Sequence, residues 1–77
     1  MEKIVKSSMI KRIASKDENN ETFESTLEVE FNNGAVWHYF KVPNKKINAL
    51  AKAESVGKYF NAEIRGKYEE YKIKARD

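Results

Sequence analysis

The chain has 77 residues, of which 35% are charged and 40% hydrophobic, with a net charge of +3 and no cysteine. This length allows one small domain, and the missing cysteine excludes disulfides, zinc–thiolate sites and cysteine nucleophiles. No apolar run reaches the roughly 18–20 residues of a membrane-spanning helix, and the first ten residues lack the apolar stretch of a signal peptide. We therefore expect a single soluble domain over residues 1–77, located in the cytoplasm.

The charge is distributed unevenly along the chain. Residues 1–40 hold five basic and seven acidic side chains, whereas residues 41–77 hold ten basic and five acidic ones. An anionic partner is therefore expected at the C-terminal half, although an ordinary solvated surface gives the same pattern.

The N-terminal segment predicts one strand and a loop. "KIVKSSMIKRIAS" (residues 3–15) mixes β-branched side chains with hydroxyls, which predicts a strand with a bend or bulge near Ser7 and Ser8. The polar, turn-rich segment "KDENNET" (residues 16–22) predicts a surface loop.

A β-hairpin is expected next. "STLEVEF" (residues 25–31) alternates apolar and polar residues, as a half-buried antiparallel strand does. "NNG" (residues 32–34) favours a tight turn because Asn and Gly accept positive φ, and "AVWHYFKV" (residues 35–42) is then the partner strand.

Two short helices are expected after the hairpin. In "VPNKKINALAKAES" (residues 42–55), Pro43 suits an early helical position. Ile47, Leu50 and Ala51 of this segment recur on one helical face.

The second helix is expected in "KYFNAEIRGKY" (residues 58–68), where Phe60, Ile64 and Tyr68 form an apolar stripe. Gly66 is expected to break or cap it. The last segment, "EEYKIKARD" (residues 69–77), suits a short strand, a helical tail or a frayed end equally well. The expected fold class is α+β, with a three-stranded antiparallel meander followed by two short helices packed on one sheet face.

Several motifs follow one another in a fixed order. They are Ser7-Ser8, Trp37-His38-Tyr39, Val42-Pro43 and the block "SVGKYFNAEI", which contains Ser55, Gly57, Tyr59, Phe60, Asn61 and Ile64. In this order they resemble the KTSC domain, a small family named for its occurrence at the C-terminus of some lysyl-tRNA synthetases.

The resemblance covers residues 5–68 and leaves residues 69–77 as a C-terminal tail. The KTSC family also occurs as stand-alone proteins of bacteria and phages. The resemblance therefore implies a bacterial or phage-encoded cytoplasmic protein. The association of the KTSC family with tRNA synthetases implies RNA binding.

The sequence predicts no enzyme, no cofactor and no metal site. His38 is the single histidine, and no nucleophile signature surrounds Ser7 or Ser8, so a catalytic triad is not expected. We expect His38, Ser7 and Ser8 to make polar contacts instead. The acidic segment at residues 16–22 lacks the ligand spacing of a calcium loop.

The best candidate binding residues lie in and after the block that starts at Ser55. A hydroxyl there can cap the second helix, a glycine lets another group approach closely, and the basic and amide side chains supply donors to a phosphate. A capped helix without any ligand explains the same pattern. The candidate phosphate-binding residues are Ser55, Gly57, Lys58, Asn61 and Arg65.

Three aromatic residues have two alternative roles. Trp37 and Tyr39 lie on one face of their strand, so they either stack on nucleobases or fill the core under the helices. Tyr59 is assigned to packing of the second helix or to base stacking.

Three functions follow from these residues. The first is a non-enzymatic binding module for nucleic acid, with RNA as the expected ligand. The second is a homo-oligomer that binds or sequesters a small nucleotide or another phosphate-bearing ligand, for example a phage protein directed against host signalling. The third is a protein–protein interaction module.

Overall fold

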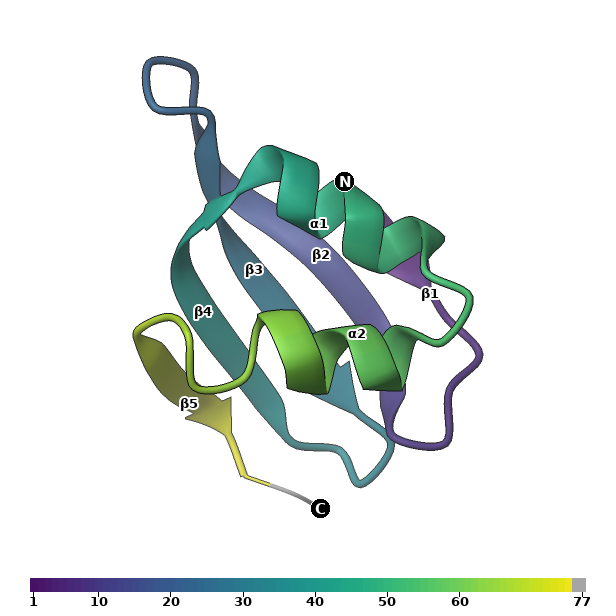
Figure 1. Cartoon of the computed structure of the whole chain (residues 1–77). Helices are drawn as coiled ribbons and strands as arrows, with labels where there is room; N and C mark the ends of the chain where they lie inside the picture. The colour runs from purple at the N-terminus through teal and green to yellow at the C-terminus, as the bar shows by residue number, and fades with distance from the viewer. Residues whose placement is uncertain (76–77) are drawn as a thin grey trace.

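The computed structural model describes residues 1–75, which form two layers. A five-stranded antiparallel sheet makes one layer, and two helices cover one of its faces (Figure 1). The strands follow one another in chain order across the sheet. The elements are β1 (Glu2–Ile4), β2 (Ile10–Asn19), β3 (Glu24–Phe31), β4 (Val36–Pro43), α1 (Asn44–Lys52), α2 (Val56–Glu63) and β5 (Glu70–Lys74). The expected α+β class with two helices is confirmed, but the expected three strands are wrong, because there are five.

One of the added strands comes from the N-terminal segment. Residues 3–15 do not form a single bent strand, because β1 and β2 are separated by a loop at residues 5–9. In this loop the Ser7 hydroxyl accepts hydrogen bonds from the backbone N–H groups of Met9, at 3.1 Å, and Ile10, at 3.2 Å. The loop reverses the chain, so that β1 pairs antiparallel to β2, with Ile4 opposite Arg12.

The expected loop at residues 16–22 is also largely wrong. Strand β2 continues to Asn19, which pairs with Glu24 of β3, so the two strands extend as a hairpin that projects beyond the sheet (Figure 1). Polar side chains suit this extension because no core lies against it. The true turn is short, and the Asn19 side chain closes it by accepting the N–H groups of Glu21 and Thr22.

The β3–β4 hairpin has the expected strands and turn. Gly34 has φ 94°, and the Asn33 side chain accepts the N–H of Ala35 at 2.9 Å. The register places Leu27 opposite Tyr39, so both side chains lie on the face that the helices cover. The alternate residues of each strand therefore lie on the other face, which no helix covers.

The core lies between the sheet and the helices. It is built around Phe60 of α2, whose ring meets Phe31 edge-on at 5.6 Å and Tyr39 at 5.4 Å between centroids. Fully burying a side chain of this kind stabilises the fold by about 1.5–3 kcal/mol. The other fully buried side chains are Ile10, Ile13, Leu27, Ile47, Leu50, Ile64, Val29 and Val42.

Strand β5 occupies the sheet edge next to β4, with Tyr71 opposite His38 and Lys72 opposite Trp37. The expected C-terminal tail at residues 69–77 thus contains a strand, and residues 76–77 lie outside the described residues. Within residues 1–75, neither helix is long and apolar enough to cross a membrane.

Candidate functional site

A pocket forms where the loop at residues 5–9 meets the start of α2. Its volume is about 380 Å³. The two segments meet closely at Gly57, where an added Cβ atom would lie 3.3 Å from the Ser7 hydroxyl oxygen, a tight contact. The fold therefore joins two motifs that lie about fifty residues apart in the sequence. The pocket is lined by Lys6, Ser7, Ser8, Met9, Glu54, Ser55, Val56, Gly57, Lys58 and Asn61.

Two serine hydroxyls in this pocket have structural partners. Ser55 is the N-cap of α2, and its hydroxyl accepts the backbone N–H of Lys58 at 3.3 Å. Ser7 accepts two backbone N–H groups, as described above. Both oxygens act as acceptors in these bonds, so each hydroxyl proton is still available for donation to a ligand.

The pocket also concentrates positive charge. Lys6 and Lys58 are exposed, and within residues 1–75 neither forms an ion pair. The N-cap uses the N–H of Lys58, which leaves the N–H groups of Val56 and Gly57 without an acceptor in this described part of the chain. The positive end of the helix dipole adds to the lysine charges. The pocket therefore combines positive charge with hydrogen-bond donors, a combination that suits an anion.

Arg65 does not belong to this pocket. In the helix expected over residues 58–68, Lys58 and Arg65 are seven residues apart, which is two turns, but α2 ends at Glu63 and Ile64 is its C-cap. Arg65 follows the cap, so the helical spacing does not apply to it. Its backbone N–H bonds the carbonyl of Phe60.

The aromatic candidates lie on the helix side of the sheet. Tyr39 is 3% exposed in the core, where burial and, to a smaller extent, the nearby Glu70 raise its pKa to about 12. Trp37 and Tyr59 are half-buried against the core. The Lys72 ammonium lies 5.6 Å from the centroid of the Trp37 ring. The Tyr39 ring is therefore inaccessible to a nucleobase in the folded protein.

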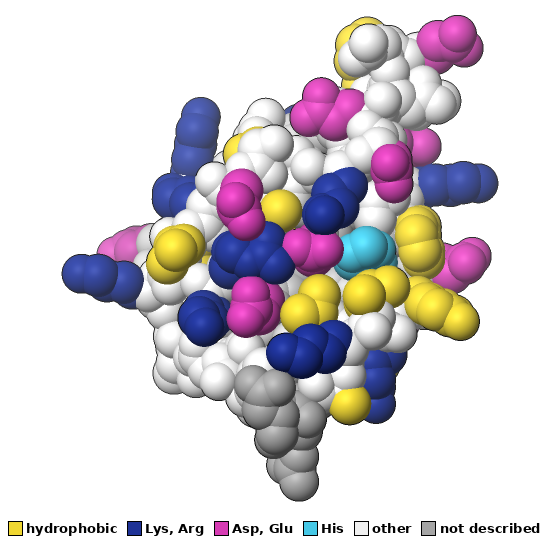
Figure 2. Space-filling model, turned by 180° about the vertical axis from the view of Figure 1, so that it is seen from behind, with side chains coloured by type: hydrophobic (Ala, Val, Ile, Leu, Met, Phe, Trp, Pro, Cys, Tyr) yellow, Lys and Arg dark blue, Asp and Glu magenta, His cyan; other side chains and the backbone are white. Residues whose placement is uncertain are grey.

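The uncovered sheet face carries a charge network (Figure 2). Arg12 donates to Glu28 at 2.6 Å, to Glu30 at 3.0 Å and to Glu2 at 2.9 Å. Glu28 also contacts His38 Nε2 through its Oε1 atom, at 2.8 Å. Acidic and basic groups thus neutralise one another on this face, and His38 is part of the network.

Glu28 is the centre of this network, although its side chain is mostly buried. Burial alone would raise its pKa, but hydrogen bonds from His38 and Arg12 and the charges of Arg12 and Lys16 outweigh this effect. They lower the pKa of Glu28 from 4.5 to about 2. Glu28 is consequently ionised at neutral pH and fixes the position of the His38 ring.

The structure places His38 and the two serines in different parts of the molecule. His38 contacts Glu28, whereas Ser7 and Ser8 lie in the loop beside α2. Within residues 1–75, no cluster of three His, Asp or Glu side chains could hold a metal ion.

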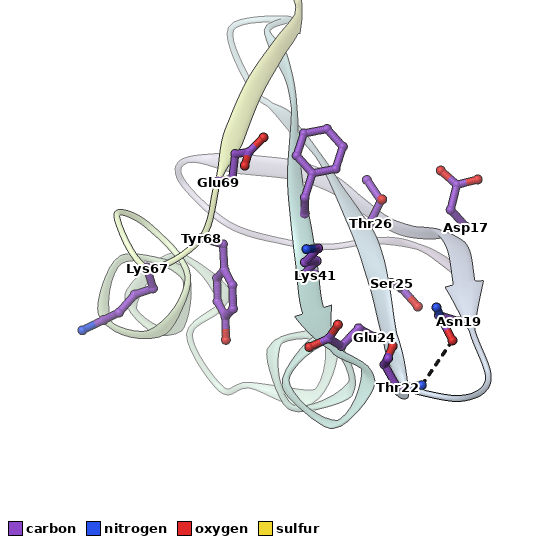
Figure 3. Close-up of a pocket in the computed structure, with 11 residues that line it drawn as sticks. Asp17, Asn19, Thr22, Glu24, Ser25, Thr26, Lys41, Lys67, Tyr68 and Glu69 are labelled. Atoms are coloured by element: carbon purple, nitrogen blue, oxygen red, sulfur yellow. Dashed lines mark hydrogen bonds between the residues drawn. The ribbon is translucent and has the colours of Figure 1, made fainter.

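A second pocket, of about 750 Å³, was not anticipated from the sequence. The projecting hairpin forms one wall, and Tyr68 stands on the opposite side (Figure 3). The pairing of β2 and β4 with β3 is irregular beside this pocket, where Asp17 has φ 52° and Lys41 has φ 56°. Carboxylates and lysines both line it, so it favours neither charge. Its lining is Asp17, Asn19, Thr22, Glu24, Ser25, Thr26, Phe40, Lys41, Lys67, Tyr68 and Glu69.

Two bacterial enzymes contain a segment similar to this chain. The lysine–tRNA ligase of Nostoc punctiforme is 46% identical over 43 residues, which are 56% of this chain and 8% of the ligase. The lysine–tRNA ligase of Trichormus variabilis is 42% identical over 53 residues, which are 69% of this chain and 9% of the ligase. The chain therefore matches less than a tenth of the length of these relatives.

Two further comparisons involve proteins closer to this one in size. A protein of Stutzerimonas stutzeri is 38% identical over 48 residues, which are 62% of this chain and 68% of that protein. The crystal structure of a KTSC domain protein from Yersinia pestis matches with a TM-score of 0.80 and 31% identity, and the match covers 96% of this chain and 97% of that one. The family model of the KTSC domain matches residues 6–68. The chain therefore belongs to the KTSC domain family.

Proposed function

We propose that this protein is a non-enzymatic module that binds RNA in the cytoplasm of a bacterium, encoded by the bacterium or by a phage. In this proposal, the pocket at the start of α2 receives a phosphate of the RNA backbone. The observation that carries the proposal is the convergence of hydroxyls, backbone N–H groups and two lysines from distant segments on this one pocket.

The donors in the pocket match the chemistry of a phosphodiester. Its oxygens accept hydrogen bonds, and the Ser7 and Ser55 hydroxyls each have a proton to donate. Lys6 and Lys58 supply the charge that displaces counterions from RNA. Glu54 is the one acidic side chain among the residues that line the pocket.

The relatives support the same class of ligand. Two of them are named as ligases for lysine and tRNA, and each contains a segment similar to this chain. In an enzyme that acts on tRNA, such a segment is suitably placed to contact RNA.

The test is fluorescence anisotropy with labelled single-stranded and hairpin RNA pools. We expect Lys58→Ala and Lys6→Ala each to weaken binding about threefold to tenfold and to reduce its salt dependence by about one counterion. The matched control is Lys45→Ala, because Lys45 is exposed on α1 and lies outside the pocket. Absence of binding at about 50 mM salt would contradict the proposal.

The pocket volume favours a second candidate function. A volume of about 380 Å³ is in the range of small-molecule sites, which is roughly 300–1,000 Å³. The alternative ligand is a small nucleotide or another phosphate compound, which the protein would bind or sequester. Thermal-shift measurements with mono-, di- and cyclic nucleotides distinguish the two functions. Binding of a small nucleotide predicts that these compounds stabilise the wild type and that Lys58→Ala reduces the stabilisation. RNA binding predicts no stabilisation by these compounds at the same phosphate concentration.

A further inference from the structure

Strand β5 leaves one edge of the sheet open. It is the last strand in the sheet order, and all five of its residues are exposed. Tyr71 is 66% exposed and Ile73 is 51% exposed, which is unusual for large apolar side chains at a sheet edge. The opposite edge is β1, which has three residues. An exposed edge with apolar side chains is a template for pairing with another strand.

The backbone of β5 shows which groups face outward. The Phe40 N–H donates to the Glu69 carbonyl at 2.9 Å, so the polar groups of Glu69 face β4. Residues two apart on a strand direct their backbone groups to the same side, so those of Tyr71 also face β4. The N–H and carbonyl groups of Glu70 and Lys72 therefore face away from the sheet and are available to a new strand.

The side chains of β5 follow the same alternation. Glu70 lies opposite Tyr39 and Lys72 lies opposite Trp37, so both project toward the helix side of the sheet. Tyr71 lies opposite His38 and projects toward the uncovered face. The sequence Glu70-Tyr71-Lys72 is thus self-complementary when two copies run antiparallel.

We propose that two copies of this chain associate through β5 and form one continuous antiparallel sheet about a twofold axis at Tyr71. In this register, Glu70 pairs with the partner's Lys72, and the two residues exchange both backbone N–H···O bonds. Tyr71 meets the partner's Tyr71 on the uncovered face. Opposite charges and aromatic residues directly across an antiparallel pair stabilise it.

A different register is less favourable. A twofold axis at Lys72 would place the two Lys72 side chains opposite each other, and like charges directly across strands destabilise pairing. The β4–β5 pairing is also irregular between Lys72 and Lys74, so the alternation of side chains is not maintained beyond Lys72. The charge pattern therefore selects the register centred on Tyr71.

The proposal does not depend on RNA binding, because none of the residues that line the pocket at α2 belongs to β5. The RNA-binding measurements and the dimerisation measurements therefore test the two proposals independently. The contact is small, so we expect a monomer–dimer equilibrium with a Kd between about 10 µM and 1 mM.

Cysteine cross-linking tests the register, since the native chain has no cysteine. Tyr71→Cys would place two Cα atoms about 4.5–5.5 Å apart across the axis, within the range for a disulfide. In Ile73→Cys the two residues would be shifted by about 13 Å along the strand, beyond that range. We expect Tyr71→Cys to give covalent dimers about tenfold faster than Ile73→Cys or Lys72→Cys under mild oxidation.

Charge reversal provides the second measurement. Sedimentation velocity is recorded at protein concentrations from about 10 µM to 1 mM, the expected range of the Kd. Glu70→Lys and Lys72→Glu should each weaken the dimer about tenfold, and the double variant should restore it. Glu21→Lys, in the turn of the β2–β3 hairpin, changes the net charge by the same amount as Glu70→Lys and should have no effect. Circular dichroism checks that each variant is folded.

Three results would overturn the proposal. The first is a wild-type chain that stays monomeric throughout the concentration range. The second is equal or faster cross-linking of Lys72→Cys or Ile73→Cys. The third is failure of the double charge reversal to restore association.

Discussion

Ser7 shows how a residue that resembles a ligand contact can first serve the fold. Its hydroxyl accepts two backbone N–H groups, and its carbonyl accepts the Asn32 side chain at 2.9 Å. These bonds hold the loop between β1 and β2, which in turn forms one wall of the candidate site. Structural and binding roles are therefore compatible at this residue, because the hydroxyl proton takes no part in these bonds.

Replacing Ser7 should destabilise the protein, whereas replacing its neighbour should not. In Ser7→Ala the N–H groups of Met9 and Ile10 lose their acceptor, which we expect to lower the free energy of unfolding by about 1–2 kcal/mol. Ser8 is exposed, so Ser8→Ala should change the free energy of unfolding by less than about 0.5 kcal/mol. Urea unfolding measures both, and equal effects would contradict this account.

Glu28 makes stability depend on acid pH. Its folded-state pKa is lowered, so its contribution is complete above pH 4.5 and is lost as the pH falls toward 2. A shift of this size corresponds to about 3 kcal/mol, since each pKa unit is worth about 1.4 kcal/mol. We expect the free energy of unfolding to fall by about this amount over that pH range.

Glu28→Gln is the matched variant for this pH effect. It keeps the shape of the side chain but cannot ionise, so we expect a smaller decrease in stability between pH 4.5 and 2 than in the wild type. Denaturant unfolding at a series of pH values measures the difference. Parallel pH profiles for the two proteins would show that Glu28 does not carry the effect.

At the scale of elements, helix α2 was predictable at its start but not at its end. A helix cap was one of the two roles considered for Ser55, the other being a phosphate contact, and the structure places Ser55 at the N-cap. The helix was expected to continue through Arg65, but it ends at Glu63. The apolar stripe misled the prediction, since Ile64 is fully buried in the core although it is the C-cap and not part of the helix.

The turn after α2 depends on the backbone of Gly66. Gly66 has φ 76°, and a Cβ atom there would meet nothing within 4 Å, so the conformation alone opposes a side chain. We expect Gly66→Ala to destabilise the fold by about 1 kcal/mol and Gly66→Asn by less, because Asn tolerates positive φ. Thermal unfolding of the two variants would show this order, and equal losses would contradict it.

The β2–β3 hairpin shows a different limit of sequence patterns. Residues 16–19 are polar and resemble a loop, yet they pair with β3 beyond the area that the helices cover. Alternation of apolar and polar residues reports burial of one strand face, so a strand with two solvated faces gives no such signal. The larger pocket, which this hairpin helps to form, was missed for the same reason.

At the scale of the whole molecule, the helices cover one face of the sheet and leave the other to charged side chains. The core is formed between the helices and strands β2, β3 and β4, whereas β5 is exposed along its length. The core cluster contains no residue of β5, which leaves this strand available for contacts outside the domain.

Removing β5 should leave a folded domain. A chain that ends at Glu69 keeps the core cluster, so we expect cooperative unfolding with a loss of about 1–2 kcal/mol. Trp37 would lose the strand and the lysine beside it, so its fluorescence should shift to longer wavelength. The chain has a single tryptophan, which makes the signal specific. Loss of cooperative unfolding would show that β5 is required for the fold.

The sequence by itself determined the fold class, the β3–β4 hairpin, the two helices and the family, because these follow from local periodicity, turn residues and ordered motifs. The tertiary structure decided the number of strands, the position of Tyr39 in the core and the contact between the Ser7 loop and Gly57. It also separated Arg65 from the candidate site. These features depend on which segments pack together across the chain, and a local pattern does not contain that information.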